Sequence, residues 1–411
     1  MKEKKLSLRQ SMLYNSVGTM TYLGCQWLIT VLAVRLGSFE DSGILLLATT
    51  LTGFFFTLCT FGIRVFQTSD TGGQYTAGRY ISTRVLTGCI GLTVCIGYLL
   101  VHRGYSLYTT AAIFLYMIFR LSEALVDTLA AEEQKLWRMD RVGLSLILRG
   151  LLSIASFAVM MRLTQSMPMA FAVMALSALC VVYLFDYRFL KKHLHFSLHI
   201  SLKESLPLMK EALPLMLNSA LLTLLAAIPR STLEASHGAT MLGYYAAIAT
   251  PAVIVQTGCS FIYTPLVTPL AELYRQGQKK AYRLTLLKAL LGVLGMMAVI
   301  LLAAQLLGEW GFRLIFADRT DELMPYLHLL LPVLMSTFCH AMIFFFDVPL
   351  TIMRKLKMMT ALHAAAVVLM LITSSWLIPR YGIEAVNWVN YLCAGGDALC
   401  MGLIALRGAS R

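Results

Sequence analysis

Charged side chains occur inside several stretches of this chain that are otherwise strongly apolar. The densest group is the segment RLSEALVD, in which Arg120, Glu123 and Asp127 are spaced i, i+3, i+7. At 100° per residue, this spacing places all three on one face of a helix. Arginine binds phosphate well, because its planar fork donates two hydrogen bonds and stays charged. This face is therefore a candidate site for an anionic ligand.

Arg149 lies in the next apolar stretch and is a candidate partner for Glu123. If the two stretches fold as a helical hairpin about a turn near Leu136, each residue is 13 positions from that turn. The two side chains then lie at similar depth, and we expect an ion pair between them. Two interpretations stay open: the charges clamp two helices together, or they line a cavity that receives an anionic substrate.

Three further arginines mark the ends of apolar stretches. Arg35 and Arg230 occupy equivalent places in the two halves of the chain, and they are candidates for substrate binding. They can equally extend to lipid headgroups, as long basic side chains do. For Arg64, at the end of the second stretch, we expect a headgroup anchor.

Two acids stand alone in the apolar stretches of the second half. Asp347 lies in FFFDVP and Asp397 in AGGDALC. Each can carry a coupling proton or sodium ion, as Glu123 and Asp127 can in the first half. Each can equally be hydrogen-bonded in a polar seam, and the nearby asparagines, Asn387 and Asn390, would supply one.

The elements that carry these charges are too apolar for a water-soluble protein. Hydrophobic residues make up 58% of the 411 residues and charged residues 13%, whereas a soluble domain has roughly 25% charged residues. Apolar runs of about 20 residues are long enough to cross a membrane as helices. The sequence therefore predicts an all-α, polytopic membrane protein with twelve spans, at 12–34, 42–63, 84–101, 105–130, 142–161, 166–187, 212–229, 243–265, 284–306, 325–350, 357–378 and 383–406.

A faint internal repeat divides these spans into two halves. LYNSVG in the first span resembles MLNSAL in the seventh, and the basic loops GRYISTR and GQKKAYR follow the second and eighth spans at a similar offset of about 200 residues. Six spans separate the copies, so the two halves point the same way. We expect a six-helix bundle at 1–190, a basic linker at 191–211 and a second six-helix bundle at 212–411.

The distribution of basic residues predicts the orientation. With both termini in the cytoplasm, 25 of the 34 Lys and Arg residues lie on the cytoplasmic side and 7 on the outer side. This bias follows the positive-inside rule and favours the inner membrane of a bacterium. It also explains the net charge of +13 without nucleic-acid binding. There is no CxxC pair and no P-loop motif, so we expect no metal site, no cofactor and no ATP hydrolysis by this chain.

Several motifs in sequence order resemble one known family. They are VRLGSFEDSGILLLA, FGIRVFQTSD with GRYISTR, RLSEALVD with EEQKLWRMDRVG, IPRSTLEA, GYYAAIATPAVIV, YTPLVTPLAELYRQG and RYGIEAV. Together they are similar to the polysaccharide-transport branch, with its Wzx-type flippases, of the multidrug/oligosaccharidyl-lipid/polysaccharide (MOP) exporter superfamily. The likeness covers essentially the whole chain. One departure is PRSTLEA, where the family pattern has PKYxID, and this leaves the role of Arg230 open.

The resemblance implies a MATE-like fold, with two six-helix bundles around a central cavity. The implied function is a flippase that moves undecaprenyl-diphosphate-linked oligosaccharide across the inner membrane by alternating access, for O-antigen, capsule or exopolysaccharide. Its cationic cavity would correspond to Arg120, Arg149, Arg35 and Arg230. Membrane lipids, a polymerase and other polysaccharide-assembly proteins would be its partners.

Two alternatives belong to other functional classes. A cation-coupled multidrug exporter of the same superfamily would favour an acidic, aromatic cavity, whereas arginines are prominent here. A membrane polysaccharide polymerase or ligase would be expected to carry a large outer loop, and the outer loops of this chain are short.

The topology can be tested with single cysteines in a background without the native cysteines. Cysteines at Lys203 and Lys279 should react only from the cytoplasmic side, and those at Arg103 and Asp318, like the other outer-side positions Arg162 and Arg313, only from outside, because the basic bias orients the spans. Membrane-impermeant maleimide labelling of intact cells and of inverted vesicles measures this. Labelling of Lys203 and Arg313 positions from the same side would contradict twelve alternating spans.

Overall fold

The computed structural model describes residues 8–70, 73–102, 104–194 and 196–408. The chain is 91% helical, and these ranges contain no strand. In the described ranges, eleven helices are long and apolar enough to cross a membrane. A bent pair, Ala252–Leu266 and Pro269–Arg275, raises the number to twelve if it is one span. The predicted class, an all-α protein that crosses a membrane many times, is confirmed.

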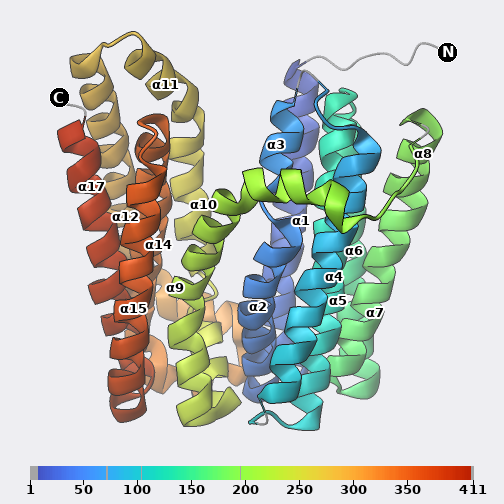
Figure 1. Cartoon of the computed structure of the whole chain (residues 1–411). Helices are drawn as coiled ribbons and strands as arrows, with labels where there is room; N and C mark the ends of the chain where they lie inside the picture. The colour runs from blue at the N-terminus through green and yellow to red at the C-terminus, as the bar shows by residue number, and fades with distance from the viewer. Residues whose placement is uncertain (1–7, 71–72, 103, 195, 409–411) are drawn as a thin grey trace. The chain divides into compact units, whose positions relative to one another are not determined.

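The helices group into two compact units, the first ending at Thr223 and the second beginning at Leu224 (Figure 1). Unit 1 contains α1 (Leu8–Leu36), α2 (Phe39–Thr60), α3 (Ile63–Ser69), α4 (Ala77–Val101), α5 (Leu107–Lys135), α6 (Met139–Thr164), α7 (Met167–Val181), the π-helix η1 (Val182–Tyr187), α8 (Arg188–Leu194) and the first part of α9 (Leu202–Ile248).

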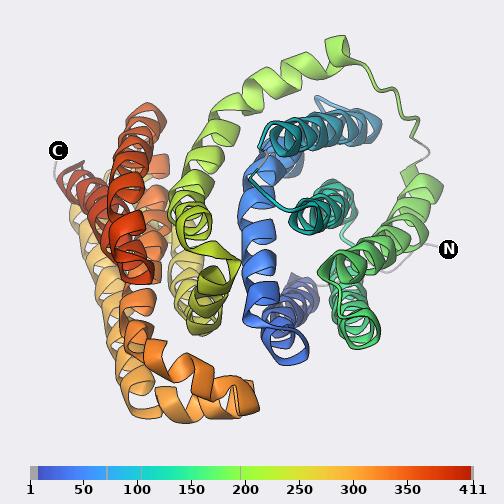
Figure 2. The ribbon, with the colours of Figure 1, turned by 90° about the horizontal axis from the view of Figure 1, so that it is seen from below.

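Unit 2 contains the rest of α9 and a second set of helices, which run side by side when viewed along their length (Figure 2). They are α10 (Ala252–Tyr263), the 3-10 helix η2 (Thr264–Leu266), α11 (Val267–Arg275), α12 (Lys279–Phe316), the 3-10 helix η3 (Ala317–Arg319), α13 (Thr320–Leu323), the 3-10 helix η4 (Met324–Leu329), α14 (Leu330–Ile352), α15 (Leu356–Tyr381), α16 (Ile383–Asn390), the π-helix η5 (Tyr391–Gly395) and α17 (Gly396–Gly408).

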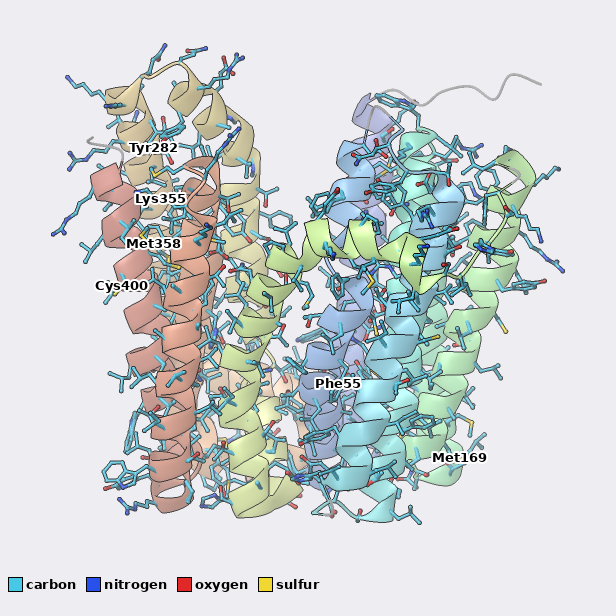
Figure 3. The ribbon with its side chains drawn as sticks, viewed as in Figure 1. Phe55, Met169, Tyr282, Lys355, Met358 and Cys400 are labelled. Atoms are coloured by element: carbon cyan, nitrogen blue, oxygen red, sulfur yellow. The ribbon has the colours of Figure 1, made fainter. Side chains whose placement is uncertain are left out.

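Apolar side chains cover the outside of each unit as well as its interior (Figure 3). Phe55 and Tyr282 are buried, whereas Met169 in α7 and Leu302 in α12 are well exposed. A water-soluble surface does not carry so many large exposed apolar side chains. In contact with lipid, exposing such side chains has no free-energy penalty.

Helix α9 extends well beyond the predicted seventh span, 212–229. It begins at Leu202, inside the segment expected to be a linker, and it continues to Ile248. Its path is interrupted at Gly238, where φ is 82° and ψ is 171°. Glycine adopts this conformation without a Cβ clash. The helix therefore begins earlier than the hydropathy pattern indicates, because its first part packs on unit 1 instead of crossing lipid.

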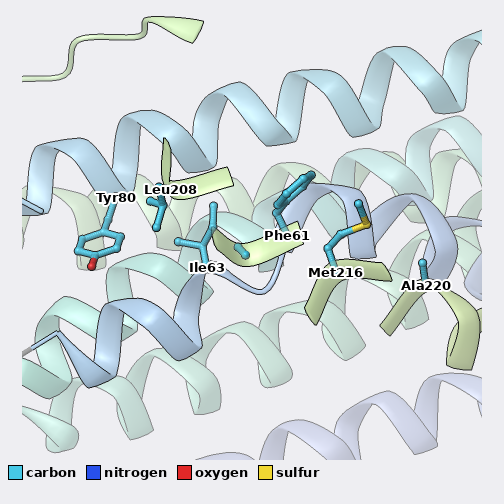
Figure 4. Packing of buried hydrophobic residues seen from close by; sticks show 7 residues of the cluster. Phe61, Ile63, Tyr80, Leu208, Met216 and Ala220 are labelled. Atoms are coloured by element: carbon cyan, nitrogen blue, oxygen red, sulfur yellow. The ribbon is translucent and has the colours of Figure 1, made fainter. Parts of the chain in front are cut away.

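The first part of α9 is held to α3 and α4 by an apolar cluster (Figure 4). Leu208 and Met216 of α9 pack with Phe61, Ile63 and Tyr80, and all five are buried. Figure 1 shows this part of α9 lying across the other helices of unit 1. The cluster thus holds α3 and α4 in place, and these are the helices that carry Arg64 and Arg84.

A sharp break between α2 and α3 redirects the chain. Phe61 and Gly62 both have positive φ, 49° and 67°, and the Phe61 N–H bonds to the carbonyl of Thr57. Two successive left-handed residues end one helix and start another in a new direction. Arg64 follows this break, so α3 can present it to α5.

Asp70 organises the loop between α3 and α4. Its carboxylate accepts hydrogen bonds from the backbone N–H groups of Tyr75 (3.0 Å) and Gln74 (2.8 Å), and from the Tyr80 hydroxyl (3.0 Å). These donors, the Tyr75 amide above all, hold the pKa of Asp70 below its ordinary value. The start of α4 is therefore anchored to the end of α3.

Helices α1 and α6 approach each other through glycine. A Cβ on Gly18 would lie 2.6 Å from the Cα of Gly143, and a Cβ on Gly143 would lie 2.3 Å from the carbonyl oxygen of Tyr14. One turn or two further along, a Cβ on Gly150 would lie 3.2 Å from the Cα of Tyr22. Small residues allow this backbone contact, as they do at many membrane helix interfaces.

Alanine at this contact should therefore destabilise unit 1. Gly143→Ala forces α1 and α6 apart, and we expect a loss of about 1–3 kcal/mol, the usual cost of overpacking. Gly24→Ala on α1 is the matched control, because no atom lies within 4 Å of its added Cβ. Denaturant unfolding of the purified protein compares them. Equal stability of the two variants would show that the close contact is absent.

Candidate functional site

Helix α5 carries two carboxylates one turn apart, Glu123 and Asp127, and each contacts two arginines. A side-chain cap at Ser106 starts the helix, accepting a hydrogen bond from the Thr109 N–H at 3.1 Å. The i, i+4 spacing sets the two acids about 6 Å apart along the helix axis. Although the two acids share a face of α5, as predicted, they contact side chains from different neighbouring helices.

The Glu123 cluster joins α1, α5 and α6. Glu123 forms an ion pair with Arg120 and accepts a hydrogen bond from the Tyr22 hydroxyl. Its Oε1 also lies 3.9 Å from Arg149 Nη2. The ion pair predicted from equal distances to the Leu136 turn is thus present, at the long end of the range. Arg120 on the same helix is the more direct partner.

Both arginines of this cluster retain unused hydrogen-bonding capacity. The Arg120 guanidinium stacks 3.9 Å from the centre of the Phe56 ring, and that of Arg149 lies 5.2 Å from the Tyr22 ring. Among the described atoms, neither Nε has a hydrogen-bond acceptor. Two guanidinium groups thus share the Glu123 carboxylate and keep two free donors, and Arg149 also acts electrostatically on Asp186.

The Asp127 cluster repeats this arrangement with α3 and α4. Asp127 pairs with Arg64 at 2.8 Å and with Arg84 at 2.9 Å. Arg84 also donates to Thr128 Oγ1 at 2.5 Å and to the Cys59 carbonyl at 2.7 Å, and its side chain is 1% exposed. Arg84 is therefore fully bonded within the protein, whereas Arg64 is 39% exposed.

The expectation that Arg64 anchors to headgroups is wrong, because the break at Phe61 and Gly62 turns it toward Asp127. Sequence reasoning also missed Arg84, which was assigned to the basic loop GRYISTR. Its position at the first residue of the predicted third span was the available signal.

A third group of charges joins α5, α6 and η1. Arg141 lies 3.5 Å from the Glu133 carboxylate and donates to the Phe185 carbonyl at 2.6 Å. Ser145 donates to Asp186 at 2.9 Å. Glu133 and Asp186 are both buried. Arg141 thus bonds a carbonyl of the widened π-turn and neutralises a buried acid, which is a structural role.

In unit 2, a buried histidine joins two acids from different helices. His363 on α15 has its Nδ1 2.6 Å from Asp397 Oδ2 on α17, and its Nε2 3.3 Å from Asp347 Oδ1 on α14. The His363 and Asp397 side chains are 0% exposed and that of Asp347 is 17% exposed. We call these three residues the triad.

Asp347 and Asp397 are therefore not isolated acids, and their partner is not the predicted asparagine seam. Asn387 Oδ1 instead accepts from Ser336 at 3.2 Å, and Asn390 Oδ1 accepts from His340 at 3.0 Å. His363 was overlooked although it lies within the predicted eleventh span. An ionisable residue in an apolar run was the signal that selected the aspartates, and it applied to this histidine too.

The two remaining predicted site residues lie apart from these clusters. Arg35 is exposed in the last turn of α1, next to the Ser38–Asp41 capping box that begins α2. Arg230 is half-buried in α9 of unit 2, where it acts electrostatically on Tyr245 and His340. Among the described residues, neither has a hydrogen-bond or ion-pair partner, and no group of His, Cys, Asp or Glu has the arrangement of a metal site.

The fold is that of the MATE transporters of the MOP superfamily. An inward-facing structure of a multidrug-resistance MATE transporter superposes with a TM-score of 0.69 at 13% identity, covering 97% of this chain and 98% of that one. A MOP superfamily transporter from Pyrococcus furiosus, described as having a binding pocket of reverse polarity, superposes with a TM-score of 0.63 at 12% identity, covering 99% and 97%.

The chain belongs to the family described as "Polysaccharide biosynthesis protein", whose model matches residues 8–271. It is also similar to the capsular polysaccharide biosynthesis protein CapF of Staphylococcus aureus, at 26% identity over 303 residues, which is 72% of this chain and 74% of that protein. The chain is therefore a multi-pass membrane protein of a polysaccharide biosynthesis family, with the fold of the MATE transporters.

The two α5 clusters predict specific couplings between substitutions. In a double-mutant cycle, Arg120→Ala and Glu123→Ala should show a coupling of about 1–3 kcal/mol, because a low-exposure ion pair is broken. The cycle of Arg149→Ala with Glu123→Ala should give a smaller value, since the contact is 3.9 Å. Unfolding free energies of the purified variants measure both.

The exposed Glu309–Arg313 pair of α12, at 2.9 Å, is the control. It should couple by no more than about 1 kcal/mol. Coupling in the Glu123 cluster that does not exceed this control would mean that these charges do not clamp the helices.

Proposed function

We propose that this chain is a flippase that moves undecaprenyl-diphosphate-linked oligosaccharide across the inner membrane of a bacterium by alternating access. Its membership of a polysaccharide biosynthesis family, its likeness to a capsular protein and its MATE fold support a transported molecule of this class. O-antigen, capsule or exopolysaccharide synthesis would use the product, in contact with membrane lipids, a polymerase and other assembly proteins. Both termini would lie in the cytoplasm.

The observation that carries the proposal is the excess of arginine over carboxylate in the α5 clusters of unit 1. Glu123 and Asp127 each contact two guanidinium groups, so arginines outnumber the carboxylates that they contact. Arg149 also acts electrostatically on Asp186. A diphosphate is a compact anion with several acceptor oxygens. Guanidinium groups bind such oxygens in pairs and keep their charge in an apolar environment.

Within each cluster, one arginine is accessible and the other is buried. Arg64 and Arg120 are 39% and 25% exposed, whereas Arg84 and Arg149 are 1% and 3% exposed. We assign phosphate contact to the accessible pair, with the buried pair holding the carboxylates in place. Arg149 would reach the phosphates only through rearrangement of Glu123.

Arg35 and Arg230 are proposed as further substrate contacts along the path. Neither has a partner among the described residues, so each can take an anion without first breaking an ion pair. Their matching positions in the two sequence halves motivate the same assignment for both.

The alternative of a cation-coupled multidrug exporter is less well supported. Several solved structures of this fold are described as multidrug transporters, so the fold itself permits this function. The arginine excess disfavours a cationic drug, because like charges repel strongly where water is scarce. An anionic lipid-linked substrate fits the same residues without that cost.

Substitution of the accessible arginines tests the proposal. Arg120→Gln and Arg64→Gln should each slow flipping about 10- to 100-fold, since a hydrogen bond to a charged group contributes about 1.5–3 kcal/mol. Lysine should restore only part of the rate, because it lacks the fork. Arg162→Gln, at the exposed end of α6, is the control and should keep the full rate.

The assay uses proteoliposomes with lipid-linked oligosaccharide purified from the source cells, and it measures the glycan that becomes accessible to an added glycosidase. The double variant Arg149→Ala with Glu123→Ala separates the two roles of Arg149. A well-folded double variant with full transport would leave Arg149 as a helix clamp. Full transport by Arg120→Gln together with Arg64→Gln would overturn phosphate binding at α5.

A further inference from the structure

The hydrogen bonds of His363 limit how many protons the triad can hold. Both ring nitrogens face a carboxylate oxygen, and a neutral imidazole has only one N–H to donate. If both acids are ionised, His363 must therefore be an imidazolium, and the triad carries a net charge of −1. One added proton on an aspartate makes it neutral. A neutral imidazole between two carboxylates would bury a charge of −2, which is too costly at this depth.

The two acids differ in a way that gives the proton a route. Asp397 is enclosed, yet its Oδ1 has no hydrogen-bond partner among the described atoms. Asp347 is 17% exposed, so it is the more accessible end of the triad. When Asp347 takes up a proton, its carboxyl group becomes neutral and no longer needs the hydrogen bond from the His363 imidazolium. The contact between α14 and α15 is then weaker.

The surroundings of the triad add few other charges. Tyr263 of α10 acts electrostatically on Asp347, and His340 of α14 on Asp397, while Arg230 of α9 acts on His340. In the described part of the chain, none of these three residues is hydrogen-bonded to the triad, and His340 Nε2 instead lies 3.0 Å from Asn390 Oδ1. The proton balance of the site is therefore set by the three triad residues themselves.

The corresponding place in unit 1 has a fixed charge instead. Glu133 precedes Asp347 by 214 residues and Asp186 precedes Asp397 by 211, and each acid pair flanks the helix that follows α5 or α14. In unit 1 this helix, α6, contributes Arg141, which does not release its proton. In unit 2 the same position in the helix order, α15, contributes His363. Of these two cations, only His363 can therefore release its proton.

We propose that the Asp347–His363–Asp397 triad is a one-proton site that couples transport to the proton gradient. The proton binds at the triad on one side of the membrane and leaves on the other in each cycle, so the site alternates between −1 and 0. The imidazole occupies an oxygen of each carboxylate, an arrangement that leaves too few free oxygens for a sodium ion, which needs a cage of oxygen ligands. The coupling to flipping, though not the proton site itself, rests on the proposed function.

The proton site can be tested without any substrate. Infrared difference spectra of the purified full chain in lipid, recorded between acidic and alkaline pH, contain the protonated carboxyl groups of all acids. Subtracting the spectrum of Asp347→Asn from that of the wild type should isolate the band of the triad. His363→Gln should move its titration to higher pH by at least about one unit, because the cation that stabilises both carboxylates is lost. His340→Gln, a half-buried histidine of the same unit that acts on Asp397 only through space, should move it by much less.

Two results would overturn the site. One is a carboxyl spectrum that is identical in the wild type, Asp347→Asn and Asp397→Asn. The other is a wild-type titration in well-folded His363→Gln. If His363→Gln does not fold, the less buried Asp347→Asn is sufficient to test the proton site. Loss of the triad band in this variant supports the site, and retention of the band contradicts it.

The coupling is tested in proteoliposomes with the same lipid-linked oligosaccharide. Flipping by the wild type and by His340→Gln should accelerate at least several-fold under an imposed proton gradient and not under a matched sodium gradient. His363→Gln should respond to neither. Acceleration by sodium, or a normal proton response in His363→Gln, would contradict proton coupling. A normal infrared titration with no flipping under any gradient would instead reject the flippase function and leave the proton site standing.

Discussion

Glu123 and Asp127 of α5 are the points to which the other helices of unit 1 are tied. Glu123 receives contacts from α1 and α6, and Asp127 from α3 and α4. Each carboxylate is stable in an apolar interior only because guanidinium groups surround it, and each guanidinium is stable only because a carboxylate is near. Two backbone features allow these ion pairs and hydrogen bonds to form. They are the glycine contact between α1 and α6 and the break between α2 and α3.

The two units use their buried charges differently. Unit 1 collects arginines, whose charge does not change with pH, and this gives a constant attraction for an anion. Unit 2 places His363 between two acids, and the charge of such a group changes with a single proton. In the proposed function, the first property would hold the cargo and the second would respond to an energy source. Placing them on different helices would keep the proposed anion-binding charges from titrating with the proposed coupling site.

Much of the fold follows from the sequence because membrane helices must satisfy their backbone internally and be apolar over a fixed length. The pairing of Glu123 with Arg149 was also accessible, since both lie on helices joined by a short turn. Contacts between distant helices were not, and Asp127 with Arg84, 43 residues apart, carries no local signal. The long α9 was missed because only one face of its first part packs on unit 1 and the rest is exposed, so hydropathy does not distinguish it from a loop. His363 was missed because a single histidine hardly changes the mean hydropathy of an apolar run.

The π-helix η5 sets the rotational phase of everything that follows it. A π-turn contains about one residue more than an α-turn, so the residues beyond it are rotated by roughly 100° relative to an unbroken α-helix. Asp397 comes two residues after η5 and points at His363 in this phase. A shift of a single residue in η5 would carry the carboxylate to another face of α17. The length of this segment is thus tied to the chemistry beside it, and insertions or deletions there are far less tolerable than substitutions.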